Sequence, residues 1–171
     1  MRPEGRVAAG GRSPLRAVSR PVLALVFGVS EILLHVIARG KIGRSPEGEL
    51  VDRYAKRMTW PFKLTEWPDT GAGKVADALT PCRTVLLDER GKAMTSEDFA
   101  HLLGRWRDEG VRETRFFLGA ADGHSDAERA SADLLLAFGP ATWPHMLARA
   151  MLAEQLYRAT TILAGHPYHR A

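Results

Sequence analysis

Short apolar runs alternate with stretches of helical periodicity along most of the chain. Compact apolar runs predict strands at residues 32–38, 61–67, 83–88, 114–118 and 134–138. Apolar residues at helical spacing predict helices at about residues 46–58, 96–110, 126–132 and 145–164. This alternation is typical of an α/β protein in which helices cover both faces of a mainly parallel sheet.

Two connections in this pattern look irregular. Residues 68–81 are rich in Gly, Asp and Thr, and we expect at most a short helix at residues 75–79. Residues 89–92 are expected to form a turn after the third strand. We predict one domain over residues 32–171.

The first 31 residues differ from the rest. Residues 1–20 mix Arg, Gly, Ser and Pro without apolar periodicity, which predicts a disordered N-terminal extension over residues 1–31. A helical addition and a targeting segment are the alternatives. Since no run of about 20 apolar residues occurs, we expect no membrane span and a cytoplasmic protein.

Charge and cysteine content narrow the picture further. Residues 1–31 hold five of the 24 basic residues and two of the 20 acidic ones, so the remainder has 19 against 18, a net charge of +1. Contact with nucleic acid would therefore depend on local basic surfaces. The single cysteine, Cys82, excludes an internal disulfide, fits a reducing compartment and is interpreted as a small structural residue.

Two predicted strands end in loops of small residues, at residues 119–123 and 139–144. Ligands of open α/β sheets bind outside the carboxyl ends of the strands, and small residues let a ligand approach the backbone. These loops favour a flat cofactor such as a nucleoside, although a tight turn explains glycine equally simply. The chain has no phosphate-binding Gly-x-x-x-x-Gly-Lys sequence, and residues 119–123 are a poor dinucleotide fingerprint.

The C-terminus carries an unusual density of reactive groups. After the predicted last helix come His166, Pro167, Tyr168, His169 and Arg170, which we call the hook. Imidazole, phenol and guanidinium groups bind, donate or accept protons. Elsewhere His35 is interpreted as an interior or edge residue of the first strand, and His101 and His124 as solvated surface residues.

Several of these segments together resemble one family. They are Leu87-Asp88 with Gly91-Lys92, the loop at 119–123, Thr142-Trp143-Pro144-His145, the run from Arg149 to Ala159 and the hook. From residue 33 onward they resemble the ribosomal large subunit methyltransferase H family of SPOUT-class enzymes.

The resemblance implies a fold, a cofactor and a reaction. The fold would be a SPOUT-type α/β-knot, in which the C-terminal part forms a deep trefoil knot. S-adenosylmethionine would contact residues at the strand ends and the knot loop, namely Leu87, Gly119, Gly139, Pro140, Ala141, Thr142, Trp143 and Pro144. The reaction would methylate N3 of pseudouridine 1915 of 23S ribosomal RNA in the assembled 70S ribosome. A homodimer would let the hook of one subunit complete the site of the other.

One departure from the family concerns the glycine loop. Where the family usually has Gly-Gly-Pro-Glu-Gly, this chain has Gly119-Ala120-Ala121-Asp122-Gly123. Alanine at 120 requires a backbone conformation that tolerates a Cβ atom, so cofactor affinity is expected to change somewhat.

The reaction assigns further roles to the hook and the last helix. Pseudouridine N3 must lose a proton as it attacks, so His169, Tyr168 and Arg170 are the candidate catalytic residues, with the base unassigned. Arg149, Arg158 and His166 are candidate substrate-binding residues. An ion pair with Glu154 explains Arg158 equally well, and His166 with Pro167 could simply fold the tail back.

Two other functions remain as alternatives. The spacing of His166 and His169 would suit a metal, but zinc needs three or four ligands and no further ligand cluster is evident, so we predict no metal. The chain could instead be a non-catalytic ribosome-binding factor that retains the fold, because its glycine loop is altered.

Overall fold

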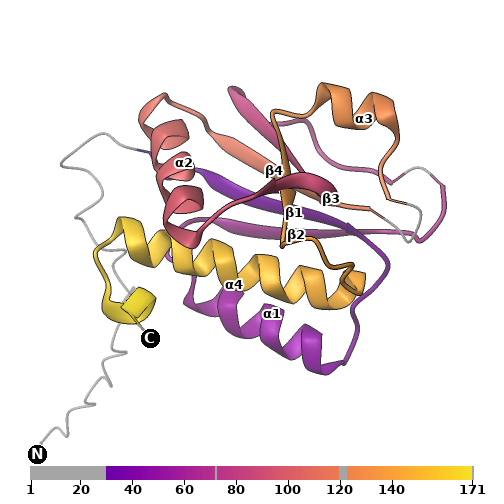
Figure 1. Cartoon of the computed structure of the whole chain (residues 1–171), viewed down its shortest axis with the longest axis horizontal. Helices are drawn as coiled ribbons and strands as arrows, with labels where there is room; N and C mark the ends of the chain where they lie inside the picture. Colours follow the sequence, from indigo (N-terminus) through magenta and orange to yellow (C-terminus); the bar gives the residue numbers. More distant parts are fainter. Residues whose placement is uncertain (1–29, 72, 120–122, 171) are drawn as a thin grey trace, which may run out of the picture.

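A parallel sheet of five strands forms the centre of the protein in a computed structural model, which describes residues 30–71, 73–119 and 123–170, with only the backbone of His169 and Arg170. The strand order is β2-β1-β4-β3-β5 and every pairing is parallel (Figure 1). The strands are β1 (Leu33–Arg39), β2 (Phe62–Trp67), β3 (Cys82–Ala93), β4 (Glu113–Leu118) and β5 (Leu134–Ala137). The predicted α/β class is confirmed.

Local capping explains where the helices begin. The helices are α1 (Pro46–Arg57), α2 (Ser96–Asp108), α3 (Asp126–Ser131) and α4 (His145–Leu163), followed by the 3₁₀ turn η2 (Pro167–Arg170). The side chains of Ser45, Thr95 and Ser125 accept hydrogen bonds from backbone N–H groups in the first turns of α1, α2 and α3. Ser125 and Glu128 form a complete capping box.

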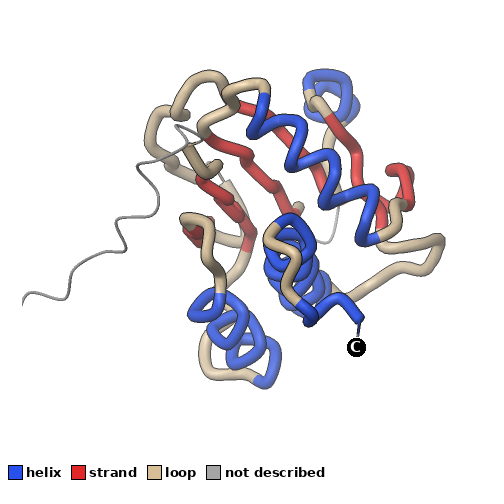
Figure 2. The backbone as a smooth tube through the Cα atoms, turned by 90° about the vertical axis from the view of Figure 1, so that its left-hand side faces the viewer, coloured by secondary structure: helices blue, strands red, loops and turns tan. Residues whose placement is uncertain are grey.

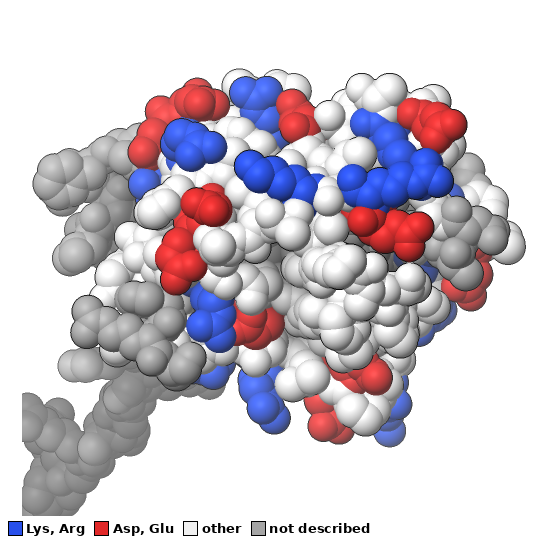
Figure 3. Space-filling view, viewed as in Figure 1, with Lys and Arg blue, Asp and Glu red and all other residues white. Residues whose placement is uncertain are grey.

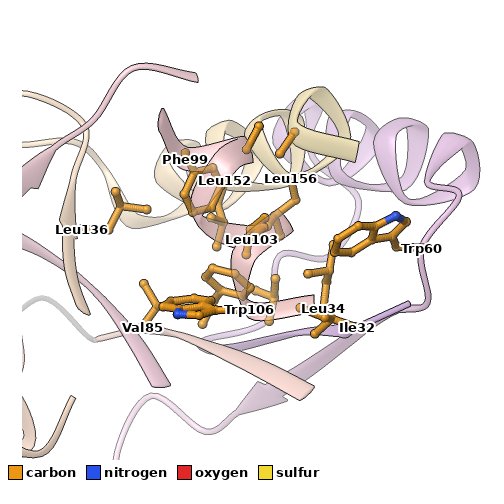
Figure 4. Close-up of a cluster of buried hydrophobic side chains, with 14 of the residues drawn as sticks. Ile32, Leu34, Trp60, Val85, Phe99, Leu103, Trp106, Leu136, Leu152 and Leu156 are labelled. Carbon is orange, nitrogen blue, oxygen red and sulfur yellow. The ribbon is translucent and has the colours of Figure 1, made fainter. Parts of the chain in front are cut away.

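Helices α1, α2 and α4 share one face of the sheet, with α4 packed between the other two (Figures 1 and 2). The core lies beneath them, where Leu34 of β1 meets Leu103 of α2 and Leu156 of α4 (Figure 4). Val36 of β1 and Phe116 of β4 belong to the same buried cluster. Nine residues of α4 are buried, so this helix is enclosed on most sides.

A buried polar network lies on the opposite face of the sheet. His35 Nδ1 is 2.8 Å from Glu113 Oε1, and His35 Nε2 is 2.8 Å from Thr65 Oγ1. Glu113 also accepts hydrogen bonds from Arg115 Nε and from the Leu79 N–H. The His35 Nδ1–H therefore donates to the carboxylate, and Nε2 accepts from the Thr65 hydroxyl.

This network fastens residues 73–81 over the sheet. Arg115 donates to the Ala76 carbonyl, and the Trp67 indole N–H donates to the Lys74 carbonyl. The segment is extended, so the short helix considered at residues 75–79 is absent. His35 is only 1% exposed, which confirms its interpretation as an interior residue.

Strand β3 is longer than predicted. The turn expected at residues 89–92 instead belongs to the strand, which continues to Ala93. Leu136 of β5 is paired with Leu87 and again with Lys92. At Gly91 the strands β3 and β5 approach so closely that a Cβ atom would lie 2.6 Å from the Leu135 carbonyl carbon. Only glycine fits at this position without a shift of the backbone. The trefoil knot stays a prediction.

Most of the predicted N-terminal extension, residues 1–29, lies outside the described residues. Within the described part, Ser30 and Glu31 are exposed and Ile32 is fully buried. The domain boundary at residue 32 stays a prediction. No helix of the described residues has the length and apolar character needed to cross a membrane. Cys82 is half-buried, and its thiol donates to the Arg83 carbonyl.

Candidate functional site

A pocket of about 290 Å³ opens at the carboxyl edge of the sheet. The end of β3, the end of β5 and the loop that leads into α4 enclose it. The lining residues are Leu87, Asp88, Glu89, Arg90, Gly123, Arg129, Leu136, Ala137, Phe138, Gly139, Ala141, Thr142, Trp143 and Ala148. Apolar walls with a few charged groups suit a flat ligand that has polar edges.

The pocket brings together most of the predicted cofactor residues. Five of them line it, namely Leu87, Gly139, Ala141, Thr142 and Trp143. Gly119 does not line the pocket but packs against the lining residue Gly123, since a Cβ atom on Gly119 would lie 3.1 Å from the Gly123 backbone. Pro140 and Pro144 belong to the same loop but do not line the pocket. Residues 120–122 of the predicted glycine loop lie outside the described residues.

Two side chains from the α3 region hold the end of β3 in place. Arg129 Nε lies 2.6 Å from Asp88 Oδ2, and the Asp88 side chain is only 3% exposed. His124 Nε2 lies 3.1 Å from the Leu87 carbonyl oxygen. The prediction that His124 is a solvated surface residue was wrong, since its ring is buried and donates across to β3.

Asp88 is held in its charged form. Burial acts to raise the pKa of the Asp88 carboxyl, but hydrogen bonds from the Arg90 N–H and from Arg129, with the Arg129 charge, lower it below the ordinary value. The same pairing raises the pKa of Arg129. The pocket wall therefore contains a fixed carboxylate and guanidinium pair, which is poorly suited to accept a proton.

The loop before α4 is shaped by glycine and by one indole. Gly139 has a φ of +88°, which side chains rarely adopt. The Trp143 indole N–H donates to the Phe138 carbonyl at 3.0 Å and fixes the ring at the mouth of the pocket, where 42% of the residue is exposed. Across the opening, the Thr142 hydroxyl approaches Glu89 at 3.4 Å.

The hook lies at the other end of α4, inside a cluster of aromatic and charged side chains. We call the residues Tyr54, Arg57, Glu154, Tyr157 and Arg158 the hook-docking cluster. The ring of Tyr168 meets that of Tyr157 edge to face, with centroids 4.7 Å apart. The Tyr168 hydroxyl donates to Glu154 at 3.2 Å, and the Arg158 guanidinium lies 4.9 Å from the centre of the Tyr168 ring.

Burial, a hydrogen bond with Tyr54 and the charge of Glu154 raise the pKa of the Tyr168 phenol. Arg158 donates twice to Glu154, at 2.9 and 2.6 Å, and this pair raises the pKa of Arg158. The ion pair considered from the sequence is therefore present. His166 is exposed, and its Nδ1 accepts from the Tyr168 N–H.

The hook does not approach the pocket of its own chain. Helix α4 begins beside the pocket and ends at the hook, so the two lie at opposite ends of this helix (Figure 1). Its 19 residues span about 28 Å at 1.5 Å per residue. The predicted catalytic and cofactor-binding residues are thus separated within one chain.

Arg149, predicted to bind substrate, is buried and 1% exposed. It donates to Glu66 at 2.8 Å and to the carbonyls of Arg39 and Gly40 at 2.8 and 3.0 Å. These contacts join α4 to the ends of β1 and β2. The structure therefore gives Arg149 an internal role and leaves it no surface for RNA.

Sequence reasoning did not assign Arg129 or His124 to the site. Asp88 was noted only as the neighbour of Leu87. Its position at the end of a buried strand was a usable signal, because strand ends define ligand sites in parallel sheets. Nothing local marks His124 or Arg129, whose partners lie 37 and 41 residues away in sequence.

Among the described residues no group of three or more His, Cys, Asp or Glu side chains could hold a metal ion. The His169 side chain lies outside the described part of the chain, so the pair with His166 stays untested.

Comparisons with known proteins agree with this geometry. Residues 32–169 match the family model described as predicted SPOUT methyltransferase. A protein from Novosphingobium aromaticivorans named ribosomal RNA large subunit methyltransferase H is 72% identical over 139 residues, covering 81% of this chain and 99% of its own. A protein of the same name from Erythrobacter litoralis is 73% identical over 140 residues, covering 82% and 99%.

A solved structure, a probable methylase family protein from Haemophilus influenzae Rd KW20, aligns with a TM-score of 0.53 at 14% identity, over 80% of this chain and 67% of that one. This likeness concerns the fold alone. With the family model spanning most of the chain and two close relatives covered almost completely, the chain belongs to the SPOUT methyltransferase family.

Proposed function

We propose that the protein transfers a methyl group from S-adenosylmethionine to N3 of pseudouridine 1915 in 23S ribosomal RNA, within the assembled 70S ribosome. The names of the close relatives support large-subunit ribosomal RNA as the substrate class. The observation that carries the proposal is the pocket at the carboxyl edge of the sheet, formed by the segments from which cofactor contacts were predicted.

The pocket residues fit such a cofactor. Leu136, Ala137 and Phe138 offer apolar walls for an adenine ring, and Gly139 leaves the neighbouring backbone accessible. Glu89, which is exposed, offers a carboxylate for cationic or hydroxyl groups. When bound, the cofactor would supply an electrophilic methyl group on a sulfonium.

We further propose that the active site forms between two copies of the chain. Since the hook lies at the far end of α4 from the pocket of its own chain, it can meet a pocket only in a second copy. An isologous two-fold dimer would bring the hook of each subunit to the pocket of the other.

The surface beside the pocket supports this arrangement. Figure 3 shows a broad area without charged side chains on the face that carries α1 and α4. Met146, Leu147 and Met151 are half-buried apolar residues in the first two turns of α4. A second copy would remove such a surface from water.

The hook would provide the chemistry that the pocket wall lacks. Attack by N3 requires loss of its proton and places charge on the flanking carbonyl groups. The paired Asp88 is a poor base, so we assign proton transfer and charge stabilisation to Tyr168, His169 and Arg170. His166 would help bind the substrate, and Arg158 would hold Tyr168 in position.

Methyl transfer to ribosomes tests the reaction directly. Purified protein, labelled S-adenosylmethionine and ribosomes that lack this methyl group should give stoichiometric label at pseudouridine 1915. Label at another nucleotide, or none, would contradict the proposed specificity. Calorimetry with the cofactor identifies the alternative, because a ribosome-binding factor without catalysis would show no cofactor binding at millimolar concentration.

Mixed dimers test the shared site. One variant lacks residues 166–171, and the other carries Gly139→Val, which places a branched side chain at a φ of +88° in the pocket loop. Each should be inactive alone. Equal mixing should restore about a quarter of wild-type activity, since half of the dimers would hold one complete site. No recovery in a mixture shown to contain mixed dimers would contradict a site formed in trans.

A further inference from the structure

Arg57 lies in the last turn of α1, where that helix reaches the hook. Its side chain is exposed, and its guanidinium carbon is 4.7 Å from the centre of the Tyr157 ring and 5.4 Å from that of Tyr168. One arginine thus lies over both an aromatic residue of α4 and one of the hook. None of the roles assigned above uses it.

Within the part of the chain that the structure describes, no carboxylate pairs with Arg57. Arg158, on the other side of Tyr168, is paired with Glu154, and Arg149 is paired with Glu66. Among the described residues Arg57 forms no ion pair, and its guanidinium lies over the rings of Tyr157 and Tyr168. It therefore presents a positive charge to solvent immediately beside the hook.

The surrounding surface strengthens this charge. Arg53 and Lys56, both exposed, lie within one helical turn of Arg57, whereas the acidic residues Glu47 and Glu49 lie in the first turn of α1. The basic end of α1 is thus the end beside the hook. Elsewhere on this face Lys and Arg are interspersed with Asp and Glu (Figure 3).

Contact with aromatic rings favours the binding of phosphate by a guanidinium group. The rings of Tyr157 and Tyr168 confine the Arg57 guanidinium, so less side-chain entropy is lost when its N–H groups bind a ligand. The planar arrangement of these donors matches two phosphate oxygens. An exposed arginine that lies over aromatic rings without a carboxylate partner is therefore suited to a phosphodiester.

We propose that Arg57 binds a backbone phosphate of the RNA substrate, beside the nucleotide that the hook engages. The identity of the RNA rests on the function proposed above, but the phosphate site rests on the geometry of α1. Because Arg57 lies beside the hook and is not among the residues that line the cofactor pocket, it should contribute to RNA binding and not to cofactor binding.

The test compares Arg57→Ala with Arg105→Ala. Arg105 is a matched control, because it is exposed in the last turn of α2 and, within the described residues, has no ion pair or ring contact. Ribosomes lacking the methyl group serve as substrate at several salt concentrations. Arg57→Ala should raise KM about 10-fold with kcat within about 3-fold of wild type, whereas Arg105→Ala should change KM less than about 2-fold.

Salt dependence gives a readout that a purely structural role would not change. Loss of one phosphate contact should reduce the slope of log affinity against log salt by about 0.7 to 0.9. Arg57→Lys keeps the charge, so its slope should match the wild type while its KM rises about 3-fold, because an ammonium lacks the planar donors. Arg57→Ala with an unchanged slope, or with an effect equal to that of Arg105→Ala, would overturn the proposal.

Two controls separate this proposal from the proposed function. The cofactor Kd of Arg57→Ala, measured by calorimetry, should stay within about 2-fold of wild type, and a larger change would contradict the inference. If the wild-type protein methylates no ribosome, the salt slope of cofactor-free binding to ribosomes still tests Arg57 by itself. Arg57 is exposed, so its variants should fold, which circular dichroism would verify.

Discussion

The two ends of α4 differ in how side chains fill the space around them. At its beginning, glycines and short side chains leave a pocket, and the one buried carboxylate is fixed by arginine. At its end, tyrosines and arginines fill the available space, and the hook folds onto the helix that carries it. The first end can receive a ligand, and the second can present side chains to one. In the proposed mechanism, methyl transfer needs both ends.

Removing the hook should produce the largest effect. Deletion of residues 166–171 should lower kcat/KM for ribosomes by at least about 100-fold, because it removes all the groups proposed to move the proton. Cofactor Kd should remain within about 3-fold of wild type, since the described residues of the hook do not line the pocket. Full activity of the truncated protein would show that the two ends are functionally independent.

Breaking the pair that supports the pocket should have a smaller effect. Arg129→Ala leaves the Asp88 carboxylate buried without its partner, and the end of β3 should shift. We expect cofactor Kd to rise about 10-fold, equivalent to about 1.4 kcal/mol, with Arg129→Lys recovering part of the loss. Calorimetry measures both. An unchanged Kd for Arg129→Ala would mean that His124 and the strand pairing suffice to hold the wall.

The His35 network belongs to neither end and should affect stability alone. Burial lowers the pKa of His35, in spite of the raising effect of Glu113. Because the folded-state pKa lies below the unfolded value of about 6.5, the unfolded chain binds more protons as pH falls below that value. The free energy of unfolding should therefore decrease from pH 7 towards pH 5, by at most about 1.4 kcal/mol per pH unit from this group.

His35→Gln should remove this part of the pH dependence while lowering stability at pH 7. Urea unfolding of both proteins at pH 5.5 and 7.5 measures the difference. Equal pH dependence in the two proteins would show that His35 does not titrate differently on folding. The ratio of cofactor to ribosome affinity should be the same in both, because His35 contacts neither end of α4.

The fold was predictable to a large extent because its signals are local. Strand and helix patterns located the elements, and the observed helices begin directly after the local caps Ser45, Thr95 and Ser125. The extension of β3 to Ala93 was missed, because Glu89, Arg90 and Lys92 read as a polar turn. Their conformation depends instead on β5, which contacts Gly91 and pairs with Lys92.

The site was predictable only in part because its decisive contacts join distant residues. The resemblance located the pocket loop, but it did not reveal that His124 is buried. The His124 ring is held against β3 by a hydrogen bond to the Leu87 carbonyl. Arg149 was predicted to bind substrate, a role that needs an exposed side chain, and arginine is seldom fully buried. Its partners, Glu66 and the carbonyls of Arg39 and Gly40 at the end of β1, are visible only once the strands are placed beside α4.

The length of α4 has a consequence of its own. If two subunits pair about a two-fold axis, each helix acts as a spacer that sets the separation between the two active sites of the dimer. Inserting one helical turn would lengthen it by about 5.4 Å. Such an insertion would misalign both sites together, even though every pocket and every hook remained intact. The number of residues in this helix would then be as strictly constrained as the chemistry at its ends.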